Sequence, residues 1–189
     1  MIFTEVVNEV LSIIKRPDKI LDVRRQVNAA VNFFCADTDF KRDVAEILLP
    51  ISAVDYSQLI SYTQLPMYRK LQYIKRAGTY EYLEPISPAK MPLLNCSTDK
   101  YYEAGTGIRI NQKRLASAMD IGYWKFPPTL TDATNNNSFW LLELAPYMVI
   151  DRAAGMIFTN IGDDASSRQH IASSNQAYLA FRTSQLSAP

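Results

Sequence analysis

Apolar residues in the first fifty positions recur at intervals of three and four, which is the spacing of one face of a helix. Each run has polar residues on its other faces, so each predicted helix has a single side to bury. Pro17 separates the first run from the second, and Pro50 ends the third. The pattern predicts three helices that pack on one another or on a partner. Their apolar positions are Val6, Val7, Val10, Leu11 and Ile14; Ile20, Val23, Val27, Ala30, Val31 and Phe34; and Phe40, Val44, Ile47 and Leu48.

From about Tyr56 to Phe126 the pattern changes to tyrosines, β-branched residues and short alternations broken by turn residues, which favours strands. Gly105 and Gly107 lie between two such runs, where a hairpin turn explains them better than a phosphate-binding loop does. The run 87–97 contains prolines and is expected to be an exposed loop. The predicted strands are 58–65, 68–75, 79–83, the two arms of a hairpin over 101–110, and 121–126.

Helical spacing returns after an asparagine-rich polar run. Ser138 is placed to cap the next helix, and Pro146 either kinks that helix or marks its true start. Gly162 ends it. Residues 163–181 favour a helix by propensity but contain few apolar positions. Residues 183–189 have neither an apolar stripe nor a cap, so we expect a loose tail there unless a partner orders it.

Together these patterns predict an α+β fold. N-terminal and C-terminal helices form one helical bundle, and a strand-rich insertion lies between them. We expect four regions along the chain. They are an N-terminal helical region over 1–55, the strand-rich insertion over 56–130, C-terminal helices that complete the bundle over 131–172, and a C-terminal tail over 173–189.

The composition is that of an ordinary globular chain. With 189 residues, 48% hydrophobic and 21% charged, it falls outside the disordered, collagen-like and coiled-coil classes. A net charge of +1 argues against a molecule that binds nucleic acid over its whole surface. No apolar run is long enough to span a bilayer and no signal sequence is evident, so we expect no membrane association.

Charge is unevenly distributed along the chain. Residues 61–130 are net +5, whereas 1–60 and 131–189 are each net −2. Within the basic region, cations alternate with tyrosines, an arrangement that suits contact with phosphate or stacking on bases. An edge hairpin protected by its charges, or rim contacts with an acidic neighbour, is the alternative. The basic cluster consists of Arg69, Lys70, Lys75 and Arg76.

Candidate catalytic chemistry is sparse. His170 is the only histidine, so one chain cannot build a metal site from several histidines. A catalytic role would need a serine, Cys35 or Cys96 to reach it in space, and a solvated histidine on a polar helix is the alternative. Asp163 and Asp164 follow a glycine and are expected to cap a helix rather than bind a metal. We therefore expect no catalytic, cofactor or metal site, and a binding or structural role.

Three segments of the C-terminal half follow one another in a distinctive order. They are YWKFPPTLT at 123–131, NSFWLLE at 137–143 and APY at 145–147. A strand ending in an aromatic residue and proline, a Trp-Leu-Leu segment, a Pro-Tyr step and an alanine-bearing helix together resemble the head-to-tail adaptors of tailed bacteriophages. These are also called connector or head-completion proteins. The resemblance covers residues 121–165, and its motifs are structural.

The resemblance implies a virion structural protein, not an enzyme, that forms a ring, commonly of twelve copies, beneath the portal protein and joins the capsid vertex to the tail. It implies helices in the ring body, strands directed toward a tail or nozzle protein, and a C-terminal segment docked on the portal. The protein would lie in the neck of the virion, and in the host cytoplasm during assembly. We expect the basic cluster to face tail subunits or passing DNA. The expected portal-docking residues are Tyr178, Leu179, Phe181 and Arg182.

Three other classes remain open. One is a different phage tail structural protein, such as a tube, terminator or baseplate protein, in which strands rather than helices make the subunit contacts. The second is a nucleic-acid-binding module that uses the basic cluster. The third is an enzyme without a recognised motif, whose chemistry would rest on Cys35, Cys96 and His170.

Overall fold

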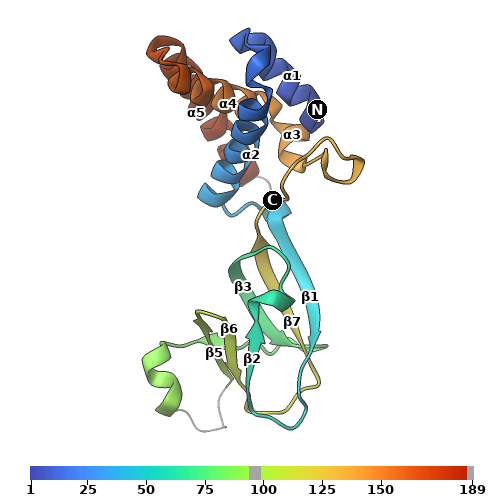
Figure 1. Cartoon of the computed structure of the whole chain (residues 1–189). Helices are drawn as coiled ribbons and strands as arrows, with labels where there is room; N and C mark the ends of the chain where they lie inside the picture. The colour runs from blue at the N-terminus through green and yellow to red at the C-terminus, as the bar shows by residue number, and fades with distance from the viewer. Residues whose placement is uncertain (94–98, 187–189) are drawn as a thin grey trace. The chain divides into compact units, whose positions relative to one another are not determined.

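The computed structural model describes residues 1–93 and 99–186, and the chain divides into two units (Figure 1). Met1–Arg42 and Phe126–Pro189 form a helical unit, and Asp43–Lys125 form a strand unit. This architecture confirms the predicted α+β fold, in which helices from both ends of the chain flank a strand-rich middle. The insertion begins at Asp43 rather than at 56, and it ends at Lys125 rather than at 130.

The helical unit is built around its fourth helix. Helix α4 contacts α1, α2, α3 and α5. Its first residue is Pro146, so this proline marks the start of the helix and does not kink it. Gly162 closes α4 with a φ of 80°, as predicted. The helices are α1 (Phe3–Ile14), α2 (Ile20–Asp37), α3 (Trp140–Leu144), α4 (Pro146–Ile161) and α5 (Asp164–Leu186).

Apolar side chains from the first two helices and from α3 and α4 form one continuous core. The apolar stripes predicted for α1 and α2 lie in it, apart from Leu11 and Ile20. The largest side chains that are almost fully buried in this unit are Phe3, Phe34, Leu130, Leu141, Leu142 and Met148.

Gly155 lets α5 approach α4 closely. A Cβ atom placed on this buried glycine would lie 2.7 Å from a side-chain carbon of Ile171 and 3.3 Å from the carbonyl oxygen of Ser167. We therefore expect Gly155→Val to separate the two helices and to destabilise the unit by about 2 kcal/mol. Urea unfolding would measure the change, with Ala172→Val on the exposed side of α5 as the control. Equal stability of the two variants would contradict the close packing.

The strand unit contains two sheets. In the first sheet β7 lies between β1 and β3 and is antiparallel to both. The second sheet has the order β2-β6-β5-β4, and its last pair is parallel. The core of the strand unit is separate from that of the helical unit and includes Ile74, Ile108, Ile110, Met119 and Ile121. The strands are β1 (Val44–Pro50), β2 (Ser57–Ser61), β3 (Tyr68–Arg76), β4 (Glu84–Pro85), β5 (Lys100–Ala104), β6 (Gly107–Asn111) and β7 (Ala118–Lys125).

The third predicted helix is wrong, because residues 44–50 form the edge strand β1. Leu49 is buried while Glu46 and Leu48 are exposed, which is the alternation of a strand. In a run of seven residues, the spacing of three and four that is typical of a helix and the spacing of two that is typical of a strand share several positions. The spacing alone therefore did not distinguish a helix from a strand. Pro50 is tolerated because an edge strand leaves one row of backbone N–H groups unused.

Two further local predictions need correction. The stretch 79–83 contributes a single bridge, between Tyr82 and Lys75, rather than a full strand. In the predicted loop 87–97, Pro88–Leu93 form a 3₁₀ segment, and 94–97 lie outside the described residues.

The predicted loose tail is also wrong up to Leu186, because residues 164–186 form one helix. Its buried side is lined by Ser167, Ile171, Ser174 and Tyr178, a spacing of four, three and four. The serines are satisfied inside the unit: the Ser174 hydroxyl donates to the Met148 carbonyl at 2.8 Å. Polar residues at buried positions hid this helix face from a search for apolar stripes.

Candidate assembly surfaces

The basic cluster is not assembled on the surface. Arg76 is 5% exposed, and its guanidinium donates to the carboxylates of Glu81 and Asp99. It also donates to the carbonyl oxygen of Arg114 at 3.2 Å. Arg76 is therefore a structural cation that ties β3 to two loops, and its expected role in facing DNA or a tail protein is wrong.

The other members of the cluster are dispersed. Lys75 Nζ lies 3.7 Å from Asp120 Oδ2, and Arg69 is half-buried. Lys70 is exposed, and its Nζ lies 5.2 Å from the ring centroid of Trp124. Residues 43–125 contain ten basic and eight acidic side chains. The strand unit thus offers a single well-exposed lysine from the cluster and no continuous basic track through its four members.

The predicted docking residues of the C-terminal segment mostly face inward. The Tyr178 hydroxyl donates to the Asp37 carboxylate and also contacts the hydroxyl of Thr38. The Tyr178 ring lies 5.0 Å from that of Phe34, measured between centroids. Burial, followed by the hydrogen bond to Asp37, raises the pKa of Tyr178. This tyrosine therefore anchors α5 to α2 and is not accessible to a portal.

Two more of these residues hold α5 in place. The Phe181 ring stacks on Trp140 with a centroid distance of 6.4 Å. Arg182 Nη1 lies 3.7 Å from Asp37 Oδ2. Of the four expected docking residues, only Leu179 presents an unpaired apolar side chain, 60% exposed.

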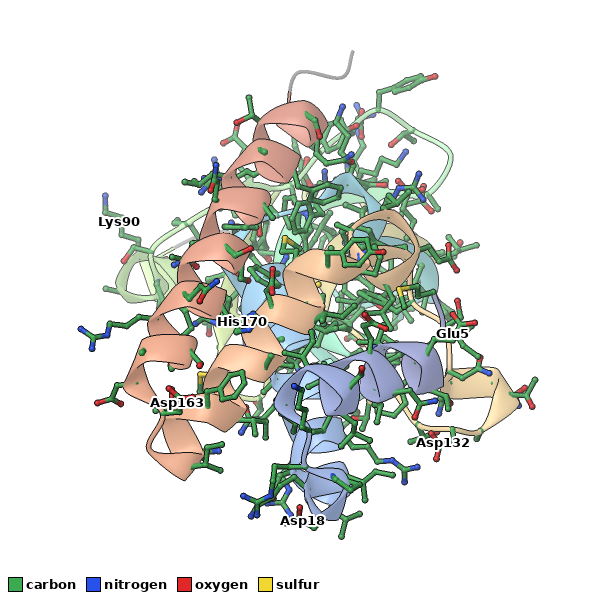
Figure 2. The ribbon with its side chains drawn as sticks, turned by 90° about the horizontal axis from the view of Figure 1, so that it is seen from above. Glu5, Asp18, Lys90, Asp132, Asp163 and His170 are labelled. Atoms are coloured by element: carbon green, nitrogen blue, oxygen red, sulfur yellow. The ribbon has the colours of Figure 1, made fainter. Side chains whose placement is uncertain are left out.

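His170 is engaged in a side-chain network between α4 and α5 (Figure 2). Its Nδ1 lies 2.8 Å from Asp151 Oδ1, and its ring stacks on Phe158. Ser173 donates to the other oxygen of Asp151 at 2.7 Å. The serine contacts the carboxylate rather than the imidazole, so the three groups lack the order of a hydrolase triad. The expected solvated histidine is therefore wrong.

Cys35 is buried in the helical core, and Cys96 lies outside the described residues. Within residues 1–93 and 99–186, no group of three or more His, Cys, Asp or Glu side chains is placed to hold a metal ion. No helix in the same ranges combines the length and apolar character needed to cross a bilayer.

A tyrosine on the outer face of the first sheet has a strongly shifted ionisation. Tyr73 donates to Glu46 Oε1 at 2.6 Å, and its ring covers Gly122, where a Cβ would lie 2.3 Å from a ring carbon. Burial, and next the hydrogen bond to Glu46, raise the pKa of Tyr73 to about 12. The sequence groups tyrosines of this region with cations, and Lys75 Nζ lies 5.9 Å from the ring centroid of Tyr73. The sequence did not indicate that the Tyr73 hydroxyl donates to a carboxylate.

This shift predicts a loss of stability in strong base. A raised pKa means that the folded state favours the neutral phenol, so its contribution is complete below pH 10 and disappears as the pH rises toward 12. Ultraviolet titration of the wild type minus that of Tyr73→Phe should give an ionisation with a midpoint near 12. A midpoint at the ordinary tyrosine value would show that the contact with Glu46 does not persist in solution.

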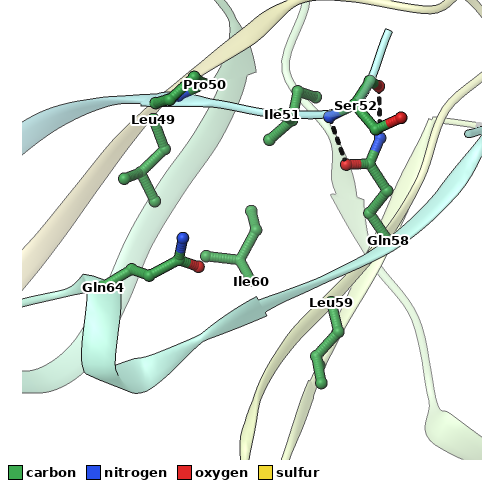
Figure 3. A pocket seen from close by; sticks show the side chains of 8 residues that line it. All are labelled: Leu49, Pro50, Ile51, Ser52, Gln58, Leu59, Ile60 and Gln64. Carbon is green, nitrogen blue, oxygen red and sulfur yellow. Dashed lines mark hydrogen bonds between the residues drawn. The ribbon is translucent and has the colours of Figure 1, made fainter. Parts of the chain in front are cut away.

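A groove of about 260 Å³ lies between the end of β1 and β2 (Figure 3). The Gln58 side-chain amide spans it at one end. It accepts from the Ser52 N–H at 2.8 Å and donates to the Ser52 carbonyl at 2.7 Å. Leu49 and Ile60 line the groove. Gln58 therefore links the end of one sheet to the edge of the other, a role that its sequence context did not indicate.

Two exposed apolar features of the helical unit were not predicted. At the corner between α3 and α4, Leu144 is 47% exposed and Tyr147 is 68% exposed. The second feature is a groove of about 220 Å³ between α2 and α4. Phe33, an apolar residue outside the α2 stripe, was the sequence signal for it. The groove is lined by Gln26, Ala29, Ala30, Phe33, Arg152 and Met156.

Comparison with known proteins adds no assignment to these surfaces. No protein-family model matches the chain, and no curated protein matches it significantly.

Proposed function

We propose that this chain is a virion structural protein of a tailed phage, a head-to-tail adaptor that forms a ring beneath the portal and joins the capsid vertex to the tail. Its work is mechanical: copies present complementary faces to one another and to the proteins above and below. The proposal includes a location in the neck of the virion, and in the host cytoplasm during assembly.

The observation that carries the proposal is the place of the segment that resembles the adaptors. Residues 121–165 include the end of β7, the whole of α3 and the whole of α4. Helix α4, which forms the C-terminal part of this segment, contacts every other α-helix of its unit and is the hub of the helical unit. A bundle from both chain ends with a strand-rich insertion also agrees with the architecture that the resemblance implies.

The inward-facing anchors of α5 change which residues could meet the portal. Tyr178 and Phe181 pack within the unit, which leaves the exposed side of α5, including Leu179, as the candidate portal contact. On the strand unit, Lys70 is the cluster residue best placed to meet a tail protein or passing DNA.

The test uses the full chain and the portal protein encoded by the same genome. Co-purification followed by negative-stain imaging should show an added ring on the portal. Leu179→Asp should weaken the complex at least tenfold, because one apolar contact is replaced by a charge. Ser184→Asp, near the end of the same helix, is the control for added negative charge. Absence of any complex with the portal would contradict the proposed function.

A tail structural protein remains the second candidate because β1 is the edge of its sheet among the described strands and has an exposed leucine, Leu48. In that case the strand unit would make the contacts between copies, and the imaged particles would be tubes or tail rings that form without the portal.

A further inference from the structure

The groove between α2 and α4 contains a guanidinium without an acidic partner. Arg152 lies 3.9 Å from the ring centroid of Phe33, and its Nη1 donates to Asn175 Oδ1 at 3.4 Å. No carboxylate in the described part of the chain lies within ion-pair distance of it. Burial lowers the pKa of Arg152. A cation that is partly shielded from water and set in an apolar groove is suited to a carboxylate flanked by apolar side chains.

The corner between α3 and α4 presents a carboxylate flanked by apolar side chains. Glu143 is exposed, and its Oε1 accepts from the Ser138 hydroxyl at 2.6 Å, which orients the carboxylate while leaving Oε2 available. Leu144 and Tyr147 follow directly and are the exposed apolar side chains of this corner. The corner therefore presents one negative charge beside an aliphatic and an aromatic group.

The corner and the groove lie on opposite sides of the same helix. At about 100° per residue, Arg152 lies roughly 140° and Met156 roughly 180° around α4 from Tyr147. The rise along the axis from Tyr147 to Met156 is about 13 Å. One copy cannot bring its own corner into its own groove, whereas a second copy can.

We propose that the α3–α4 corner of one copy inserts into the α2–α4 groove of the next. Glu143 pairs with Arg152, and Leu144 and Tyr147 pack on Phe33 and Met156. Each copy then has one corner and one groove in use, so the contact is heterologous and repeats from copy to copy until the ring closes. The inference deepens the proposed adaptor function and rests on it for closure into a ring.

Charge reversal tests the pairing. Sedimentation velocity of the full chain over a range of concentrations should show self-association. Arg152→Glu and Glu143→Arg should each weaken it at least thirtyfold, because like charges then meet at the contact. The double variant R152E/E143R should recover association, as should an equal mixture of the two single variants. Arg168→Glu, an exposed site on α5, is the control for charge and should associate as the wild type does.

Recovery by the double variant cannot come from a repaired contact within one chain, because Glu143 hydrogen-bonds to Ser138 whereas Arg152 contacts Phe33 and Asn175, and the two residues make no ion pair with each other. A monomeric wild type at every concentration, single variants that associate normally, or a double variant that stays monomeric would each overturn the pairing. Portal binding is scored separately. Recovery of association without portal binding supports the contact and contradicts the adaptor function, whereas portal binding without any effect of charge reversal does the opposite.

Discussion

Replacing Tyr178 with alanine is expected to destabilise the helical unit by about 4 kcal/mol. The substitution empties the space beside Phe34 and removes the hydroxyl that reaches Asp37 and Thr38. Phe181 and Arg182 follow one helical turn later and contact Trp140 and Asp37, so the end of α5 should loosen as well.

Two matched variants separate packing from hydrogen bonding. Tyr178→Phe keeps the ring and should cost about 1 kcal/mol, whereas Leu179→Ala changes a 60% exposed side chain and should have almost no effect. Urea unfolding can be followed by Trp140 fluorescence in a Trp124→Phe background, which reports the helical unit alone. If alanine at position 178 costs no more than alanine at 179, the buried position of the tyrosine is wrong.

Replacing Arg76 with alanine is expected to destabilise the strand unit by about 3 kcal/mol. Arg76 is almost fully buried, and its guanidinium donates to the Asp99 carboxylate. This carboxylate also accepts a hydrogen bond from the Lys113 N–H at 2.7 Å. The substitution leaves this carboxylate without its cation. The expected cost is at the lower end of the range for a buried pair because the Glu81 side chain is 51% exposed and can turn to water.

Arg114→Ala is the matched control, because the guanidinium of Arg114 approaches the same glutamate at 3.8 Å but is 75% exposed. Its loss should cost no more than about 0.5 kcal/mol. Trp124 fluorescence in a Trp140→Phe background reports the strand unit. Similar costs for the two arginines would show that Arg76 is solvated in solution.

The contrast between these arginines shows why the site was harder to predict than the fold. Burial of a whole segment leaves a periodic signal, and α1, α2 and α4 followed from it. The environment of one cation depends on residues that are distant in the sequence. Asp99, which accepts from Arg76, is 23 positions away from it. Residues that are close together in the sequence therefore have separate environments in the structure. Arg76 belongs to a salt-bridge network, Lys70 lies over Trp124, and Lys75 pairs with Asp120.

Helix α5 marks a second limit. Its buried positions include Ser167 and Ser174, whose hydroxyls are satisfied by Thr159 and Met148. A pattern search that equates burial with apolar residues misses such a face, although a repeat of small residues could have been sought. The apolar groove at Phe33 and Arg152 is lined by residues of two helices that are far apart in the sequence. Phe33, an apolar residue outside the α2 stripe, was therefore the one sequence feature that indicated it.

The register of the first sheet has a consequence for how such chains can change. Val44 is opposite Trp124, one residue inside each end of the strand unit. In this ladder the Ile51 N–H donates to the Ser117 carbonyl, so residues 51 and 117 form a hydrogen-bonded pair. Hydrogen-bonded and non-hydrogen-bonded pairs alternate along an antiparallel ladder, so the pair at 44 and 124 is non-hydrogen-bonded, with Cα atoms about 4.5 Å apart. A linker of a few residues could therefore replace the whole insertion and still join Arg42 to Phe126. Lineages could exchange or enlarge this segment as a cassette while the bundle that carries it stays the same.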